Sequence, residues 1–506
     1  MKFNFTSRNK DVTRNHEGER AYLLIDELEL YSAVVTSMLS DTFYEGAKDR
    51  VERIAQLVRK VDPEFVAKLA VYARTEMNLR SVPMLLVVEL ARVHSGDNLV
   101  ARTVERVVQR ADEITELLAC YQWRNAREGV KKLSRVSNQI LKGLRAAFNR
   151  FDEYQFAKYN RSGAEVKLRD ALFLVHPKAK DAAQQEIFDK IVTDSLKTPY
   201  TWETELSALG QTMFADEAEK NAAFAAKWEE LVASRKMGYM AMLRNLRNIL
   251  TACAGRQTVE AACDFIGDAE RVRNSKQLPF RFLAAYRETK DVDSPDTQRV
   301  VDALESAVLA SAANINGFDA DTSVLLACDV SGSMFSPISP KSKVMSYDIG
   351  LLLAMLLRNR CSNVIAGMFG DIWKTIAIPG KGILSAVDVM YRREGEVGYS
   401  TNGYKVIDWL IGQRIKIDKV MMFTDCQMWN SRYDGSTFEK SWDRYKKIAP
   451  DAKLYLFDLS GYGNSPLRMT REDVVLISGW SDKVFDVLQA LEDGPDALKA
   501  IKAIEV

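Results

Sequence analysis

The sequence predicts two modules, an all-α helical-repeat module over residues 1–315 and a doubly wound α/β domain over residues 316–506. In the first, apolar residues recur at i, i+3, i+4 and i+7, the spacing of a buried helix face. In the second, short continuous apolar runs alternate with amphipathic segments of helix length, which is typical of a mostly parallel sheet covered on both faces. A chain of 506 residues is also long enough to bury two separate cores.

The helical part contains apolar stripes separated by residues that break helices. The stripes are Val51, Ile54, Ala55 and Val58; Phe65, Leu69 and Tyr72; Val104, Val107, Val108 and Ala111; and Leu243, Leu246 and Leu250. Breaks are expected at Asp62-Pro63, Ser95-Gly96-Asp97 and Thr198-Pro199. The sequence shows no repeat of fixed period. Many helices of modest length with short connections nevertheless indicate an α-solenoid, whose repeats often diverge in sequence.

Five apolar runs are the predicted strands of the α/β domain. They are Val324–Ala327, Val364–Phe369, Val420–Phe423, Leu454–Phe457 and Val474–Ile477. The segments between most of them are predicted helices, including Lys343–Arg358, Tyr404–Arg414 and Phe438–Ile448. In sheets of this kind, ligands bind beyond the carboxyl ends of the strands at the point where the strand order reverses. Side chains that follow the strands directly are therefore candidate ligands.

Five oxygen-bearing residues form a candidate metal site. The motif Asp329-x-Ser331-x-Ser333 follows the first run, Thr401 lies in a later loop, and Asp425 follows the third run. This is the pattern of a metal-ion-dependent adhesion site, and its oxygens suit Mg²⁺ or another hard divalent cation such as Mn²⁺. We expect both serines to coordinate directly, the threonine directly or through water, and the two carboxylates directly or through waters that they orient. The alternative is that these Asp and Ser residues only cap helices.

Charge is distributed unevenly along a chain whose net charge is only +1. Residues 121–180 hold 14 Lys or Arg and 5 Asp or Glu, which leaves 56 basic and 64 acidic residues elsewhere. Aromatic residues are interleaved with these bases. A charge run is usually a solvated helix face, but an excess this concentrated favours a phosphate backbone as partner. The nearby aromatic rings are suited to stack on unpaired RNA bases. Candidate contacts on these grounds include Lys131, Lys132 and Arg135.

Composition argues against several other classes of protein. The N-terminus lacks the apolar core of a signal peptide, and no apolar stretch approaches the ~20 residues needed to span a bilayer. We therefore expect a cytoplasmic protein with no membrane partner. The six cysteines form no CxxC pair, and Cys328 and Cys426, beside the metal loops, are expected to be small buried residues. The three histidines lie in separate contexts, and we find neither a Gly-rich phosphate loop nor a Ser/His/Asp set, so we expect no enzymatic activity.

Several short motifs, in order, resemble the Ro ribonucleoprotein autoantigen family, which joins a TROVE (telomerase, Ro and vault) module to a von Willebrand factor A domain. They are Thr42-Phe43-Tyr44; Leu79-Arg80-Ser81-Val82-Pro83; Lys158-Tyr159, Arg161, Gly163 and His176; Met242-Leu243-Arg244-Asn245-Leu246; Pro279-Phe280; and Ala284-Ala285-Tyr286. The resemblance covers nearly the whole chain, which looks shorter than animal members and is identified as a bacterial-type member. It implies a closed ring of HEAT-like repeats sealed by the A domain.

The resemblance also implies a function. Family members bind small noncoding Y RNAs on the outer surface of the ring, and the single-stranded ends of misfolded RNAs through its hole, in RNA quality control, processing or degradation. By position, Lys158, Arg161 and His176 match family residues implicated in Y RNA binding, with Arg161 offset by one residue. Lys167, Arg169 and Lys178 accompany them by charge alone. From its neighbours alone, His176 is better explained as a partly exposed residue at a helix end, and only the family match makes a role in RNA binding equally well supported.

Two other functions are compatible with the residues. The chain could be a protein-interaction adaptor whose A domain holds an acidic partner, an exoribonuclease or another protein, through Mg²⁺. The basic excess in 121–180 argues for RNA instead, because an adaptor does not require it. A hydrolase using the bound metal is the third alternative, but a single adhesion-type cation normally binds rather than cleaves.

Overall fold

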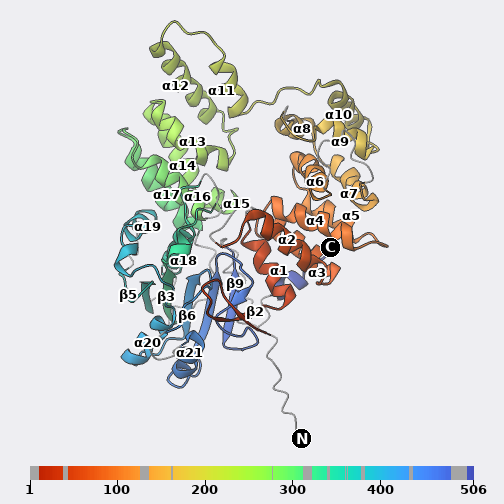
Figure 1. The fold of residues 1–506 in the computed structure, drawn as a ribbon. Coiled ribbons are helices and arrows are strands. Elements are labelled where there is room, and N and C mark those ends of the chain that lie inside the picture. The colour runs from red at the N-terminus through yellow and green to blue at the C-terminus, as the bar shows by residue number, and fades with distance from the viewer. Residues whose placement is uncertain are drawn as a thin grey trace. The chain divides into compact units, whose positions relative to one another are not determined.

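The computed structural model describes residues 11–37, 44–125, 136–160, 163–275, 277, 279–311, 322–338, 342–358, 361, 363–377, 382–431, 437–479 and 498–506. The chain forms two compact units (Figure 1). Unit 1 contains residues 1–52, 277–286 and 305–500, and unit 2 contains residues 53–276, 287–304 and 501–506. This division differs from the cut between 1–315 and 316–506 expected from the sequence. The N-terminal segment and a short helical stretch belong to the unit that holds the α/β domain.

Unit 1 is built on a six-stranded sheet in the order β5-β4-β3-β6-β7-β9. Each of the five predicted apolar runs is a strand, and these five strands are parallel. The strands are β3 (Ser323–Asp329), β4 (Asn363–Phe369), β6 (Lys419–Thr424), β7 (Lys453–Asp458) and β9 (Val474–Ser478), with β5 (Trp373–Thr375) antiparallel at the edge. Because β4 and β6 pair with opposite sides of β3, the strand order reverses at β3, and the carboxyl end of β3 is a switch point.

Helices of the α/β domain alternate with these strands. They are α18 (Ser346–Arg358), α19 (Ile383–Tyr391), α20 (Tyr404–Gln413) and α21 (Phe438–Lys446), with the short 3₁₀ helices η2 (Gly332–Phe335) and η3 (Glu394–Glu396). α18 packs against β3 and β6. At this contact Gly350 is required, because a Cβ there would come within 2.8 Å of the Phe423 Cβ atom. The predicted helices near 343–358, 404–414 and 438–448 are all present, with slightly different ends.

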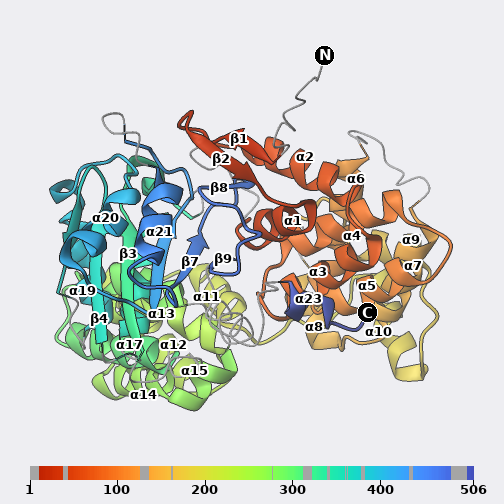
Figure 2. The same cartoon turned by 90° about the horizontal axis from the view of Figure 1, so that it is seen from below.

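A second, three-stranded antiparallel sheet joins the two ends of the chain in unit 1. It contains β1 (Val12–Arg14), β2 (Arg20–Leu23) and β8 (Asn464–Ser465), which lie side by side in Figure 2. α1 (Asp26–Val35) follows β2, and its Tyr31 hydroxyl donates to the carbonyl of Ser478 at the end of β9. The sequence did not predict this sheet, since its strands are two to four residues long and one partner is remote.

Unit 2 consists almost entirely of helices, as the apolar stripes predicted. It contains α3 (Pro63–Thr75), α4 (Ser81–Val93), α5 (Leu99–Val107), α6 (Ala111–Arg124), α7 (Asn138–Phe148), α8 (Glu153–Tyr159), α9 (Leu168–Val175), α10 (Ala182–Thr193), α11 (Trp202–Gly210), α12 (Glu217–Ala233), α13 (Tyr239–Thr251), α14 (Arg256–Gly267) and α15 (Ala269–Ser275). The division between the units falls within four helices, α2 (Ala47–Val58), α16 (Pro279–Thr289), α17 (Thr297–Ser311) and α23 (Lys499–Lys502).

The helical core is formed by the predicted apolar faces. α3 packs against α4 and α5, α4 against α6, and α5 against α7, as expected of stacked helical repeats. The expected break at Asp62-Pro63 is the start of α3, where the Asp62 carboxylate accepts from the amides of Glu64 and Phe65. One stripe was assigned wrongly to a single helix. Val104 and Val107 lie on α5, but Ala111 begins α6, so all are buried on two helices separated by a bend.

Candidate functional site

The five predicted metal ligands lie at the carboxyl edge of the six-stranded sheet. Asp329 ends β3, and Asp425 directly follows β6. Ser331 directly precedes η2, Ser333 lies within η2, and Thr401 lies just before α20. All five are buried, and none is more than 6% exposed. The positions follow from the fold, because parallel strands present their carboxyl ends at one edge and the chain turns there.

Hydrogen bonds bring the three ligand-bearing loops together. The amide of Gly332 donates to the Tyr399 carbonyl at 3.1 Å, and the amide of Trp429 donates to the Thr401 carbonyl at 2.8 Å. The hydroxyl of Thr424 donates to Asp329 Oδ2 at 2.6 Å, which connects the first and third loops directly. The sequence motif therefore corresponds to one site in space.

Two buried carboxylates in this site repel each other. Burial raises the pKa of Asp329 to about 6. Burial also raises the pKa of Asp425 to about 7, and the charge of Asp329 adds to this shift. Asp425 Oδ1 accepts from the Gln427 amide, but its Oδ2 is buried and has no hydrogen-bond partner. An unpartnered carboxylate oxygen beside a second carboxylate is an arrangement that a cation would stabilise.

The donor set consists of two carboxylates and three hydroxyls. Ser331 Oγ and Ser333 Oγ are 3.3 Å apart, and Asp329 Oδ1 accepts from the Ser331 amide at 2.9 Å. Among the residues that the structure describes, no group of three or more His, Cys, Asp or Glu side chains is placed to hold a metal. This all-oxygen set instead matches the preference of Mg²⁺ for carboxylates, hydroxyls and retained waters.

A tight turn positions the loop that carries Thr401. Asp371 holds this loop, because its Oδ1 accepts from the Ser400 amide and its carbonyl from the Asn402 amide group. Gly398 has a φ of +75°, and a Cβ there would overlap the Asp371 carboxylate. The loop can therefore approach Asp371 only with glycine at this position.

The N-terminal segment also reaches the site, which the sequence did not indicate. The Asn15 side chain donates to the Met428 carbonyl at 2.8 Å, and the His16 amide donates to Gln427 Oε1 at 2.9 Å. The hydroxyl of Tyr44 donates to the carboxylate of Glu17, in the same N-terminal part of unit 1. Burial and the carboxylate of Glu17 raise the pKa of Tyr44 well above its usual value. Of the residues bonded to the candidate ligands, Thr424 and Gln427 lie within two residues of Asp425 in sequence, so the motif itself could have suggested them.

The two cysteines beside the metal loops are buried, as predicted. Cys328 lies in β3 and Cys426 follows Asp425, and both are at most 2% exposed. Burial raises the pKa of both thiols. They therefore remain protonated near neutral pH and contribute to packing.

The predicted RNA-contacting residues in the described chain are exposed and lie on α8, α9 and the turn after α9. They are Lys158 on α8, Lys167 and Arg169 at the start of α9, and His176 and Lys178 just after it. His176 ends α9 in a left-handed conformation with φ +48°. We call these five residues the α8–α9 basic surface. Lys131, Lys132, Arg135 and Arg161 lie outside the described residues.

Aromatic rings accompany these cations. Lys158 Nζ lies 5.7 Å from the centre of the Tyr154 ring, and the Arg169 guanidinium lies 5.7 Å from that of Phe173. Tyr154 is 46% exposed and Phe173 is 48% exposed, so both rings present area to solvent. Exposed rings next to exposed cations fit the stacking of unpaired bases.

Part of the basic excess in 121–180 is used inside unit 2. Arg145 donates to the Val175 carbonyl at 2.9 Å, and Arg150 donates to the carbonyls of Glu105 and Val108. Arg124 pairs with the buried Glu89 at 2.5 Å. These three side chains hold helices together, so the charge available to a ligand is smaller than the sequence count suggests.

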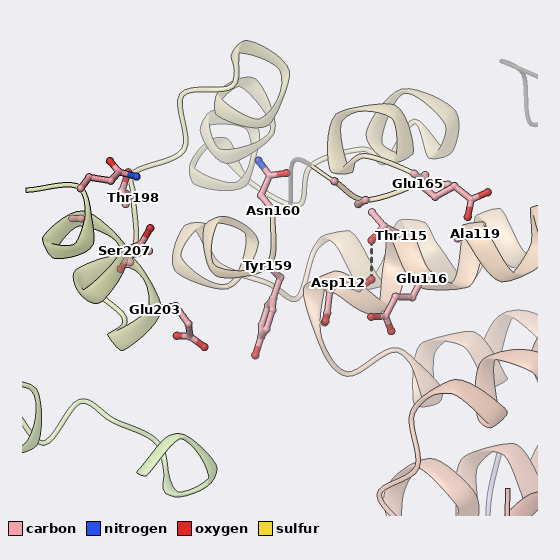
Figure 3. Close-up of a pocket in the computed structure, with 16 residues that line it drawn as sticks. Asp112, Thr115, Glu116, Ala119, Tyr159, Asn160, Glu165, Thr198, Glu203 and Ser207 are labelled. Atoms are coloured by element: carbon pink, nitrogen blue, oxygen red, sulfur yellow. Dashed lines mark hydrogen bonds between the residues drawn. The ribbon is translucent and has the colours of Figure 1, made fainter. Parts of the chain in front are cut away.

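A cavity in unit 2 does not suit a phosphate backbone. It has a volume of about 1070 Å³ and lies between α6, the loop after α8, and α11 (Figure 3). Four carboxylates line it, from Asp112, Glu116, Glu165 and Glu203. Burial raises the pKa of Glu116, while Arg80, 3.2 Å away, acts in the opposite sense. Because its lining is acidic, this cavity would repel the phosphates that the α8–α9 basic surface would attract.

Comparison with known proteins identifies the helical module. A family model described as the TROVE domain matches residues 13–222 and 193–300, which together are more than half of the chain. The chain belongs to the TROVE domain family. This confirms the recognition made from the sequence motifs. Membership extends into the N-terminal segment of unit 1, since the match begins at residue 13.

Two relatives and one solved structure extend this TROVE assignment. Telomerase protein component 1 from Rattus norvegicus is 24% identical over 342 residues, and that from Mus musculus is 22% identical. These alignments cover 51% of this chain and only 12% of the length of those relatives. The crystal structure of the Deinococcus radiodurans Ro (RSR) protein is similar with a TM-score of 0.61 at 20% identity, covering 92% of this chain and all of that one. It confirms the predicted fold, helical repeats joined to an α/β domain.

No described helix of this TROVE protein is both long enough and apolar enough to cross a membrane.

Proposed function

We propose that this TROVE protein is a noncatalytic RNA-binding component of a ribonucleoprotein. The observation that carries the proposal is the α8–α9 basic surface, where exposed cations lie beside exposed aromatic rings. Membership of the TROVE family supports an RNA partner. The cations would neutralise phosphates, and Tyr154 and Phe173 would stack on unpaired bases.

The finer parts of the proposal follow the family resemblance. We propose that the RNA is a small, noncoding, Y-like RNA, that single-stranded ends of misfolded RNAs are a second ligand, and that the protein acts in RNA quality control, processing or degradation in the cytoplasm. Entry of such ends into a central hole is part of this proposal. So is the recruitment of an exoribonuclease or another protein by the A domain.

We further propose that the candidate metal site holds Mg²⁺, or Mn²⁺ in its place. Asp329, Ser331, Ser333, Thr401 and Asp425 would supply its ligands, directly or through water. The support is the unpartnered buried Oδ2 of Asp425 beside a second buried carboxylate, together with two hydroxyls 3.3 Å apart. A cation held there would be able to bind an acidic group of a partner protein. The carboxylates of Asp329 and Asp425 would neutralise the charge of the cation, and the hydrogen bonds between the three loops would hold the ligands in place.

The α/β domain also supports the adaptor as a second function. Tyr399 and Ile372 are 53% and 48% exposed, and both lie in loops bonded to the metal loops. Exposed apolar side chains beside a cation suit a partner that combines a carboxylate with an apolar contact. Purified protein that carries no nucleic acid, as judged by its absorbance at 260 nm, would favour this function over RNA binding.

The test is RNA affinity measured by fluorescence anisotropy with a hairpin bearing a 3′ overhang and with the same hairpin blunt-ended. We expect affinity to fall with salt, with a log–log slope of about 0.7 to 0.9 for each phosphate neutralised. The overhang should bind more tightly, because a duplex hides its bases. Equal binding of the two would contradict recognition of single-stranded ends, and a flat salt dependence would contradict the basic surface as the binding site.

A further inference from the structure

The loop that carries Asp425 is bonded to the turn of a hairpin that lies more than 400 residues earlier in the sequence. We call residues 425–430 the Asp425 loop and residues 15–19, between β1 and β2, the hairpin turn. Both belong to unit 1. Three hydrogen bonds join them, from the Asn15 side chain to the Met428 carbonyl at 2.8 Å, from the His16 amide to Gln427 Oε1 at 2.9 Å, and from the Asn430 side chain to Glu19 Oε2 at 2.8 Å.

Gln427 lies at the centre of these contacts and is fully buried. Besides accepting from His16, its side chain donates from Nε2 to the Asp425 carbonyl at 3.1 Å and to Asn464 Oδ1 at 3.2 Å. A glutamine amide group has two protons and one carbonyl oxygen, so both protons and the oxygen are used. The Gln427 side chain is therefore fixed from three directions.

Gln427 in turn holds the candidate ligand Asp425. Its main-chain amide donates to Asp425 Oδ1 at 3.0 Å, while its side chain binds the Asp425 carbonyl. One carboxylate oxygen and the main chain of Asp425 are thus held by the same residue. The other oxygen, Oδ2, is buried without a hydrogen-bond partner within the described part of the chain, so it is the oxygen left for a cation.

The hairpin turn is closed by the same residue that docks it. Asn15 Oδ1 accepts from the Glu19 amide at 2.9 Å, and the Asn15 amide donates to the Glu19 carbonyl at 2.9 Å. β2 continues from this turn and pairs with β8, which contains Asn464. The two partners of the Gln427 side chain outside its own loop, His16 and Asn464, therefore belong to one small sheet.

We propose that Gln427 is a positioning residue of the cation site, and that the hairpin turn, acting through Gln427, holds Asp425 in place for the cation. This inference rests on the proposed Mg²⁺ site and adds a regulation to it, because cation affinity then depends on docking of the hairpin. Without the docked turn, the cation itself would have to order the Asp425 loop, and affinity would be lower. Partners that orient metal ligands typically change metal affinity by about 10- to 100-fold.

Coupling of this kind is reciprocal. If the docked hairpin turn favours the cation, the cation must favour the docked turn by the same factor. Binding of Mg²⁺ should therefore make opening of the turn rarer. The main-chain amides of the turn, including that of His16, should then exchange their hydrogens with solvent more slowly.

The first test is divalent-cation binding to the full-length Gln427→Met variant, with Mg²⁺ followed by calorimetry and Mn²⁺ by electron paramagnetic resonance. Methionine has a similar length and keeps the main-chain amide that binds Asp425, but it removes the three side-chain hydrogen bonds. We expect the affinity to fall by about 10- to 100-fold. The matched control is Gln413→Met, the same change at an exposed position at the end of α20, which should bind the cation as the wild type does.

Hydrogen exchange followed by mass spectrometry tests the reciprocal effect. In the wild type, a peptide covering residues 12–23 should gain protection when Mg²⁺ is added, whereas a peptide covering α13 in unit 2 should not change. In Gln427→Met the gain should disappear, even at Mg²⁺ concentrations that saturate the variant. A purely structural role of Gln427 would instead lower the protection of residues 12–23 equally with and without Mg²⁺.

The outcomes separate this inference from the proposed metal site. If the wild type binds Mg²⁺ and Asp425→Asn does not, the site stands, and wild-type affinity in a folded Gln427→Met protein would then overturn the role of Gln427. If the wild type binds neither Mg²⁺ nor Mn²⁺, the metal site is wrong and this inference is wrong with it. Should Gln427→Met fail to fold, the exchange measurement on the wild type decides, because protection of residues 12–23 that Mg²⁺ leaves unchanged would overturn the coupling.

Discussion

The candidate cation site and the α8–α9 basic surface are built in opposite ways. In the first, each predicted ligand is at most 6% exposed, and hydrogen bonds connect the loops that carry them. In the second, the predicted residues are exposed, and the structure shows little that fixes their side chains beyond contacts with aromatic rings. A buried site therefore depends on the geometry of a few atoms, whereas a surface of this kind depends on the number of charges. Single substitutions should affect the two regions very differently.

The largest effect is expected at Asp425. Asp425→Asn keeps the shape of the side chain but removes the charge that makes a divalent cation favourable, so Mg²⁺ binding should be lost, as it should in Asp329→Ala. Both variants should fold, because the sheet core consists of apolar strands, and both should bind RNA normally. Calorimetric titration with Mg²⁺ and RNA binding on each variant would check this.

The control for this change is Asp408→Asn, which removes a partly exposed carboxylate paired with Arg444 in the same domain. It should leave cation binding unchanged. Loss of RNA binding in a folded Asp425→Asn protein would show that the two regions are coupled. It would contradict the expectation that cation binding and RNA binding are independent.

The next effect is the pH dependence of cation binding. An unperturbed aspartate has a pKa near 3.8, whereas the folded, cation-free protein has raised values of about 6 for Asp329 and about 7 for Asp425. Between pH 4 and 7 the folded state therefore holds protons that the unfolded chain has released. Without a cation, the free energy of unfolding should decrease as the pH rises through this window.

A bound cation should reverse this trend, because it requires the ionised carboxylates. Its affinity should fall by about tenfold per pH unit below pH 7, and more steeply below pH 6, where both groups must lose a proton. Melting temperatures with and without Mg²⁺ at pH 5.5 and pH 7.5 would test this. A Mg²⁺-dependent increase that is the same at both values would show that these two carboxylates are not the ligands.

The smallest effects on folding are expected from the basic surface. Changing Lys158, Lys167 and Arg169 to Ala together should reduce RNA affinity and make its salt dependence shallower, by about 0.7 to 0.9 in slope for each phosphate that is no longer neutralised. The free energy of unfolding should change by no more than about 0.5 kcal/mol per substitution, because exposed charges contribute little to stability. Salt-series binding curves and denaturant unfolding would measure both quantities.

A matched triple variant controls for net charge. Lys220, Arg247 and Arg256 lie in the same helical unit and are paired with Glu217, Glu288 and Glu260, respectively. Changing these three to Ala removes the same charge and should weaken RNA binding far less. Equal losses in the two triple variants would mean that overall charge, and not the α8–α9 surface, attracts the RNA.

The sequence placed the candidate cation ligands better than the residues of the basic surface, for a physical reason. An apolar run that ends in Asp329 or Asp425 predicts a buried strand, and it also predicts that the aspartate lies at the carboxyl end of that strand. The motif and the fold therefore point to the same place. Charge along a sequence specifies no such place. The count over 121–180 included Arg145 and Arg150, which the structure uses to bind main-chain carbonyls.

The features that the sequence missed depend on contacts without a local pattern. β2 has four residues and β8 has two, so neither shows a periodicity, and their pairing is visible only in the folded chain. The bond from the His16 amide to the Gln427 side chain likewise follows from no local pattern. The stripe that ends at Ala111 was misassigned because buried residues on two successive helices continued the same spacing across a bend.

The small antiparallel sheet cannot be completed until nearly the whole protein has been synthesised. Tyr22 of β2 pairs with Ser465 of β8, a partner 443 positions later in the chain. At about 5 to 20 residues per second, a ribosome needs roughly 20 to 90 s to travel that distance. During that period the β1–β2 hairpin has been synthesised, but the edge of β2 that pairs with β8 has no partner strand, because β8 has not yet been synthesised. A nascent chain stalled before residue 464 should therefore leave the first residues open to proteases or chaperones.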